Sequence, residues 1–161
     1  MRTVQFVKMV VKDEKYKPQY ANETDACMDL RVVVEPQDGN NSERTCFIAP
    51  GETKVFGTGL HVSVPLGHVL CVVPRSSTGF KLNCMLANTV GIVDAGYRDE
   101  IKLAIHNFGK ETVCLQDGQR VAQFTILPTP QIMPIFGKDD ENFRQNDRGG
   151  GIGSTNEKLG I

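Results

Sequence analysis

The 161-residue sequence lacks several features that would assign it to a common class of protein. It contains no apolar run near the ~18 residues of a membrane helix, and its start, Met1 to Lys8, has no signal-peptide core. The formal net charge is only −1, which argues against a general nucleic-acid or membrane surface. We therefore expect a cytoplasmic protein without membrane contact or direct nucleic-acid binding, in which locally placed Arg and Lys meet any anionic ligand.

The cysteines also exclude one kind of site. The five are odd in number and widely spaced, and no two form a Cys-x-x-Cys pair. A zinc site is therefore not expected. Most lie in apolar runs such as 69–73 (VLCVV), which predicts buried, reduced thiols.

Helical periodicity is almost absent, and short β-like runs alternate with turn signals such as Pro50-Gly51 and Asp117-Gly118. One short helix is expected after Pro74, capped by Ser76 or Ser77 and stopped near Gly79. From Gly137 the sequence is polar and glycine-rich, which predicts a β domain over 1–136 and a mobile arm over 137–161. We expect an all-β, jelly-roll-like sandwich or barrel, with strands at 3–11, 28–34, 44–48, 52–56, 60–64, 68–73, 84–90, 100–107, 111–115, 120–127 and 131–135.

The segment 88–101 (NTVGIVDAGYRDEI) is the most informative part of the chain. It carries one acid, Asp94, and one aromatic residue, Tyr97, three positions apart among apolar residues. It predicts a tight β-hairpin that can wrap a flat ring, present backbone amides to it and hold a carboxylate beside a reacting atom. Taken alone, Asp94 is also explained as a turn acid and Tyr97 as a cross-strand packing residue.

Four further segments combine residue types that suit an anion or a metal ion. Segment 74–81 (PRSSTGFK) brings an Arg and two hydroxyls to a predicted helix start. Segment 148–155 (RGGGIGST) can lay backbone amides along phosphate oxygens. Gln123 lies within 118–124 (GQRVAQF), and Asp29, within 25–30 (DACMDL), is placed to hold a metal-bound water. Each segment also has a simpler explanation. Segment 74–81 is explained as a capped turn and segment 148–155 as a disordered terminus. Gln123 is explained as an exposed amide and Asp29 as a surface acid.

In their order along the chain, residues 25–30, 74–77, 91–101, 118–124 and 148–155 of these segments resemble the five motifs of the homotrimeric dUTP pyrophosphatases (dUTPases), with motif sequences similar to those of bacterial or phage members. The turns 50–52, 58–60 and 64–67 also resemble that family, so the resemblance covers nearly the whole chain. It implies a jelly roll that forms a homotrimer with three shared active sites at subunit interfaces. Each arm then closes over a site of a neighbouring subunit.

The implied reaction is hydrolysis of dUTP to dUMP and pyrophosphate, by in-line attack of water on the α-phosphorus with Mg²⁺ bridging the phosphates. It limits uracil incorporation into DNA and supplies dUMP. By resemblance, Asp94 orients and deprotonates the water, and Asp29 holds Mg²⁺ through water. The remaining matched positions bind substrate: Arg75, Ser76, Ser77 and Gln123 the phosphates; Asn88, Ile92 and Val93 the uracil; Tyr97 the sugar, with Lys102 a further candidate; and Arg148, Ile152, Gly153, Ser154 and Thr155 from the arm.

Three positions depart from the family pattern. Cys27 and Asp99 stand where the family usually has Gly, so a left-handed backbone at Cys27 would be strained, whereas Asp tolerates it better. Ile152 stands where the family usually has an aromatic residue that stacks on uracil, and the loss of this stacking forfeits ~1 kcal/mol. We expect weaker closure of the arm with the chemistry retained.

Two other functions are compatible with this fold. One is dCTP deamination, but the catalytic Glu of the deaminases would fall at Ala104. The other is a catalytically weak regulator that binds a protein partner, suggested by the departures at Cys27, Asp99 and Ile152. The retained Asp94, Tyr97 and Arg75 favour an active enzyme.

Overall fold

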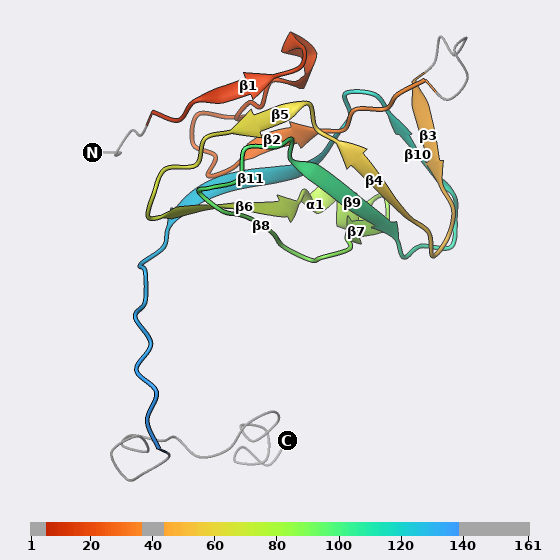
Figure 1. The fold of residues 1–161 in the computed structure, drawn as a ribbon. Helices are drawn as coiled ribbons and strands as arrows, with labels where there is room; N and C mark the ends of the chain where they lie inside the picture. Colours follow the sequence, from red (N-terminus) through yellow and green to blue (C-terminus); the bar gives the residue numbers. More distant parts are fainter. Residues whose placement is uncertain (1–5, 37–43, 139–161) are drawn as a thin grey trace. The chain divides into compact units, whose positions relative to one another are not determined.

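The structure is a computed structural model that describes residues 6–36 and 44–138. The chain divides into two units, residues 1–131 and 132–161. In the described residues all regular secondary structure lies in the first unit, and the expected all-β class is confirmed (Figure 1). The elements are β1 (Met9–Val11), η1 (Glu14–Tyr16), β2 (Met28–Arg31), β3 (Thr45–Ile48), β4 (Thr53–Gly57), β5 (Leu60–Val62), β6 (His68–Pro74), α1 (Ser76–Phe80), β7 (Cys84–Leu86), β8 (Gly91–Val93), β9 (Lys102–Asn107), β10 (Val113–Gln116) and β11 (Arg120–Pro128).

The strands form four antiparallel sheets. The largest has the order β2-β11-β6-β8, a second has the order β4-β9-β7, and β10-β3 and β1-β5 are two-stranded. All four contribute to one core: Leu60, Leu70, Ile105 and Leu115, one from each sheet, are all fully buried. Burying such a side chain contributes about 1.5–3 kcal/mol, so this shared core fixes the sheets against one another.

Alternating burial explains why the longer strands were predictable. In β9 the residues Leu103, Ile105 and Asn107 are buried, while Lys102, Ala104 and His106 between them are more exposed, as expected for a strand with one face on a core. The expected strand 28–34 is shorter because the chain changes sheets after Arg31. Val33 donates its N–H to the Gly57 carbonyl at the end of β4 (2.8 Å).

The tight hairpin expected over 88–101 is wrong. β8 pairs with β6 in the four-stranded sheet, whereas β9 pairs with β4 and β7 in the three-stranded sheet. The segment therefore joins two sheets through a loop, 94–101. Gly91 permits this pairing, since a Cβ at this position would lie 3.1 Å from the Val72 Cβ.

Several expected boundaries also need correction. The N-cap of α1 is Arg75, without a side-chain cap, and Gly79 lies inside the helix. The strand expected over 84–90 ends at Leu86, because Thr89 has a φ of 59° and turns the chain. Residues 131–135 form no strand; Pro134 within this range has no N–H to donate to a ladder. In the expected strand 3–11, residues 3–5 lie outside the described residues and β1 begins at Met9.

The left-handed backbone that would strain Cys27 does not occur. Among the described non-glycine residues, only Asn83 and Thr89 have positive φ, so neither Cys27 nor Asp99 needs the glycine of the family pattern. The five thiols are free. Cys46 and Cys84 are buried as expected, whereas Cys27 and Cys71 are only partly buried. Cys114 is exposed, because it lies on the outward face of the two-stranded sheet opposite Phe47.

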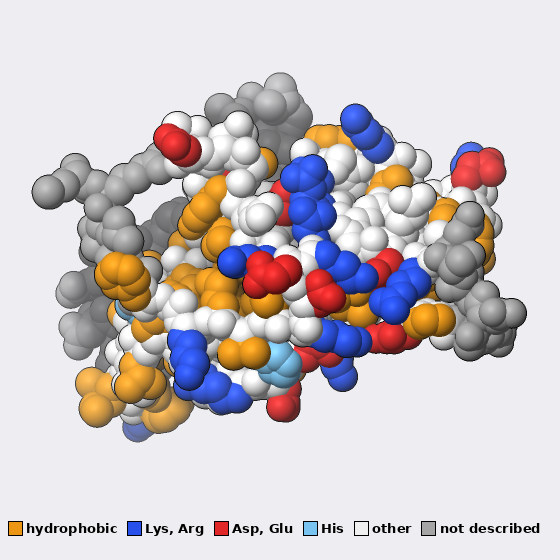
Figure 2. All heavy atoms as spheres, turned by 90° about the horizontal axis from the view of Figure 1, so that it is seen from above, with side chains coloured by type: hydrophobic (Ala, Val, Ile, Leu, Met, Phe, Trp, Pro, Cys, Tyr) orange, Lys and Arg blue, Asp and Glu red, His pale blue; other side chains and the backbone are white. Residues whose placement is uncertain are grey.

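A half-buried carboxylate ties the N-terminal segment to the turn before β11. Asp117 accepts hydrogen bonds from the Tyr16 hydroxyl (2.8 Å), the Val34 N–H (2.9 Å) and the Lys15 ammonium. Burial raises the pKa of Asp117, but these hydrogen bonds outweigh burial and hold the pKa below its ordinary value. On the face shown in Figure 2, basic side chains are interspersed with acidic ones.

We expect Asp117 to contribute stability that acid removes. Because its pKa is lowered on folding, the contribution is present above the unfolded pKa of about 3.9 and is lost as pH falls through the folded pKa. Asp117→Asn should lower the free energy of unfolding at pH 7 by about 2 kcal/mol. Urea unfolding at pH 7 and at acid pH should then show a smaller pH dependence in the variant.

Glu35→Gln is the matched control. Glu35 also pairs with a lysine, Lys12 at 2.6 Å, and its pKa is also lowered, but both side chains are largely exposed. Solvent screens such a pair, so little change is expected. Equal losses in the two variants would contradict the role given to burial at Asp117.

Candidate active site

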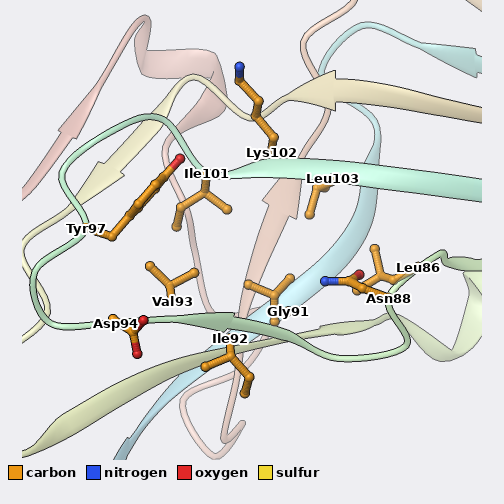
Figure 3. Close-up of a pocket in the computed structure, with 11 residues that line it drawn as sticks. Leu86, Asn88, Gly91, Ile92, Val93, Asp94, Tyr97, Ile101, Lys102 and Leu103 are labelled. Atoms are coloured by element: carbon orange, nitrogen blue, oxygen red, sulfur yellow. The ribbon is translucent and has the colours of Figure 1, made fainter.

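A cavity of about 240 Å³ opens between β8, the 94–101 loop and the start of β9 (Figure 3). Its walls come from both large sheets, with Val72 and Val93 on one side and Leu86 and Leu103 on the other. The cavity is smaller than the ~300–1,000 Å³ typical of drug-sized ligands, so it suits a single flat ring. The full lining is Val72, Leu86, Asn88, Gly91, Ile92, Val93, Asp94, Tyr97, Ile101, Lys102 and Leu103.

The loop places its acid and its aromatic ring at this cavity. Asp94 directly follows β8, and the Tyr97 N–H donates to its carbonyl (3.0 Å), which closes a turn. The Tyr97 hydroxyl donates to the Glu100 carbonyl (2.9 Å) and so holds the ring across the loop. Within the described residues, no side chain or backbone group hydrogen-bonds or ion-pairs with the Asp94 carboxylate. It is available as an acceptor for a water molecule.

Other predicted base-binding residues differ in their orientation. Asn88 and Val93 lie at the cavity, but Ile92 is 60% exposed and its side chain points away from the gap between β8 and β9 (Figure 3). Lys102 also extends away from this gap. The sequence prediction missed the apolar walls, Val72, Leu86, Ile101 and Leu103, which are almost fully buried. They have the sequence pattern of core residues, and no local signal distinguishes them: Val72 lies inside β6, and Leu86, Ile101 and Leu103 lie at or beside the ends of β7 and β9.

A second cavity, of about 410 Å³, is strongly basic. Four cationic side chains line it: Arg31, Arg75, Lys81 and Arg120. Ser77 also lines it, whereas Ser76 is exposed and outside the lining. Gln123 is half-buried and donates to the Pro74 carbonyl (3.3 Å). The four cationic side chains together fit a polyanion, since guanidinium groups bind phosphate oxygens with charge-assisted hydrogen bonds.

Asp29 is the acid of this basic region. It is 6% exposed; Arg75 Nε lies 2.8 Å from one carboxylate oxygen and Arg120 donates to the other at 3.1 Å. Direct coordination of Mg²⁺ does not fit a carboxylate flanked in this way, and the described part of the chain has no group of three or more potential metal ligands. Each oxygen keeps a lone pair, so Asp29 fits a contact to the ion through a bound water.

The two cavities share no lining residue. Asp94 and Tyr97 line the first, and Arg75 and Ser77 line the second. The arm positions Arg148, Ile152, Gly153, Ser154 and Thr155 lie outside the described residues. No helix in the described ranges combines the length and apolarity that crossing a membrane would require.

Comparisons with known proteins agree on one family. A family model described as dUTPase matches residues 14–155. The chain is 33% identical over 142 residues to the deoxyuridine 5'-triphosphate nucleotidohydrolase of Chlamydia felis, covering 88% of this chain and 91% of that protein. It is 36% identical over 143 residues to the enzyme of the same name from Escherichia phage T5, covering 88% and 92%.

Solved structures give the same result for the fold. The dUTPase of Streptococcus mutans superposes with a TM-score of 0.67 at 25% identity, covering 81% of this chain and 100% of that chain. A variant dUTPase from phage phi11 of S. aureus, described with a structural Mg(II) ion, gives 0.66 at 22% identity, covering 87% and 99%.

Proposed function

The chain belongs to the dUTPase family, and from that premise we propose that it hydrolyses dUTP to dUMP and pyrophosphate by attack of water on the α-phosphorus. The observation that carries the proposal is the cavity beside β8, in which a carboxylate without a partner among the described residues and a fixed aromatic ring adjoin a pocket for one heterocycle. Asp94 is assigned as the group that orients and deprotonates the water.

The base end of the site provides selectivity. Uracil presents two carbonyl acceptors and one N–H donor, which backbone groups of β8 and Asn88 can match. Cytosine would leave buried polar groups unpaired, and such mismatches are costly. Tyr97, packed under the sugar, would clash with a ribose 2'-hydroxyl. The orientation of Ile92 supports a backbone contact for this residue rather than a side-chain contact.

The basic cavity is assigned to the triphosphate. Arg75 and Ser77 would bind its oxygens, with Ser76 and Gln123 as further contacts, and Asp29 would hold Arg75 and Arg120 in place until the substrate arrives. Charge neutralisation by preorganised cations is a major source of catalysis. Mg²⁺ bound to the phosphates would supply further charge neutralisation, held by this chain only through a water on Asp29.

The composition of the two cavities supports a shared active site. Base and triphosphate belong to one molecule, yet the cavities assigned to them share no residue within one chain. We infer that the base cavity of one subunit faces the basic cavity of its neighbour in a homotrimer. The arm over 137–161 would close each site, bringing Arg148 to the terminal phosphate, Ile152 over the base, and Gly153, Ser154 and Thr155 beside the phosphates.

Pyrophosphate release tests the function. With Mg²⁺, dUTP should be turned over, and dCTP, dTTP and UTP should react at least about 100-fold more slowly by kcat/KM. Conversion of dCTP to dUTP would instead indicate a deaminase, and absence of turnover would favour a regulatory protein.

The same assay tests the arm. A chain shortened after Asp147 should retain nucleotide binding but lose most of its turnover, because the water-excluding closure is removed. Unchanged turnover would show that the arm does not close the site.

A further inference from the structure

Glu100 connects the base-binding loop to a notch formed by two glycines. Its carboxylate accepts a hydrogen bond from the Gly59 N–H (2.7 Å). A Cβ on Gly57 would lie 2.5 Å from the same carboxylate oxygen, so the absence of a side chain at Gly57 makes the space for it. Glu100 is not one of the residues to which the resemblance gives a role, and it does not line the base cavity. It lines a separate cavity of about 310 Å³, together with Gly57 and Gly59.

The peptide unit after Glu100 orients Tyr97. Its carbonyl accepts from the Tyr97 hydroxyl (2.9 Å), and its N–H, on Ile101, donates to the Leu60 carbonyl (2.9 Å). The next carbonyl, of Ile101, accepts from the buried Thr58 hydroxyl (2.7 Å). Thr58 thus fixes the far end of this peptide unit, and the carboxylate of Glu100 fixes the near end. The tilt of the Tyr97 ring depends on both.

We propose that Glu100 is a positioning residue for sugar selectivity: its carboxylate, bound between Gly57 and Gly59, fixes the carbonyl that orients Tyr97. This inference rests on the proposed function, in which Tyr97 excludes the ribose 2'-hydroxyl. Without the carboxylate, Gly59 loses its acceptor and the near end of the peptide unit is released. Tyr97 then has room to tilt, and a 2'-hydroxyl is tolerated.

The test compares selectivity, which a loss of stability alone would not change. Glu100→Ala should lower the ratio of kcat/KM for dUTP to that for UTP by about tenfold. KM for dUTP should rise while kcat falls less than twofold, because Asp94 is untouched. Glu100→Gln keeps an oxygen acceptor of the same shape and should retain the ratio within about twofold. Calorimetric affinities for dUMP and UMP give the same ratio without turnover.

Two further variants separate the bond from general effects. Gly57→Ala leaves Glu100 intact but displaces its carboxylate, so it should reproduce the Ala variant, and combining the two should add little. Glu52→Ala is the matched control, because the Glu52 carboxylate accepts from the Ala49 N–H at the same distance, 2.7 Å, in a turn that lines none of the three cavities. It should leave the ratio unchanged.

The outcomes distinguish this inference from the function on which it rests. If the unaltered chain releases no pyrophosphate from dUTP, the proposed function fails and the binding ratio decides the inference. If Glu100→Ala and Gly57→Ala keep the selectivity of the unaltered chain, the inference is overturned. A Gln variant as impaired as the Ala variant would also overturn it, because charge rather than the bond would then be responsible.

Discussion

Asp94→Asn is expected to lower kcat for dUTP by about 10²–10⁴-fold, the usual contribution of a general base. Nucleotide affinity should be nearly unchanged. Asn has the same shape and can still accept a hydrogen bond, but it cannot take a proton at neutral pH. No described residue pairs with the Asp94 carboxylate, so its replacement breaks no structural contact. Pyrophosphate release and calorimetric binding of dUMP measure the two effects separately.

Asp99→Asn is the control for this experiment. Asp99 lies in the same loop and is exposed, but it does not line the base cavity. The same chemical change there should leave kcat within about twofold. Appreciable turnover by the Asp94 variant, or an equal loss in the control, would remove Asp94 from its assigned role.

Mixing two inactive variants is expected to restore about a quarter of the activity. Arg75→Ala removes a proposed phosphate contact and should be nearly inactive alone, as should Asp94→Asn. When equal amounts are unfolded together and reassembled, a shared site receives its Asp94 from one chain and its Arg75 from another. Each donor is intact with a probability of one half, so about one site in four is complete.

The mixing experiment has a clear negative outcome. If Asp94 and Arg75 of a single chain served the same site, every site would carry one defect and no activity would return. Mixing Asp94→Asn with Asp94→Ala provides the control, since no assortment of these chains restores the acid. Activity in that mixture would indicate contamination by unaltered protein rather than complementation.

Local sequence patterns predicted which residues line the cavities better than they predicted which residues contact one another in space. The alternation of apolar and polar residues identified β9, and the positions of Gly and Pro located most turns. The pairing of Asp94 and Tyr97 at three residues' separation predicted a ligand-binding loop, and both residues line the base cavity. These features depend on residues close together in the chain.

The failures involve contacts between distant segments. The segment 88–101 has the local composition of a hairpin, but β8 pairs instead with β6, about 20 residues earlier. Nothing near Asp29 indicates that Arg75 and Arg120 would enclose it, 46 and 91 positions away. The anchoring of Glu100 by Gly57 and Gly59 depends on a missing side chain, and no local pattern predicts where such a space will be filled.

With the basic cavity assigned to the triphosphate as proposed, the enclosure of Asp29 gives that cavity a resident counterion. Before nucleotide binds, the Asp29 carboxylate already partly neutralises the positive charges of Arg75 and Arg120. An incoming triphosphate has charge enough to compete with one carboxylate, whereas inorganic phosphate has less. The Asp29 carboxylate can pair again with Arg75 and Arg120 as pyrophosphate leaves. This competition favours release of a product that carries almost as much charge as the substrate.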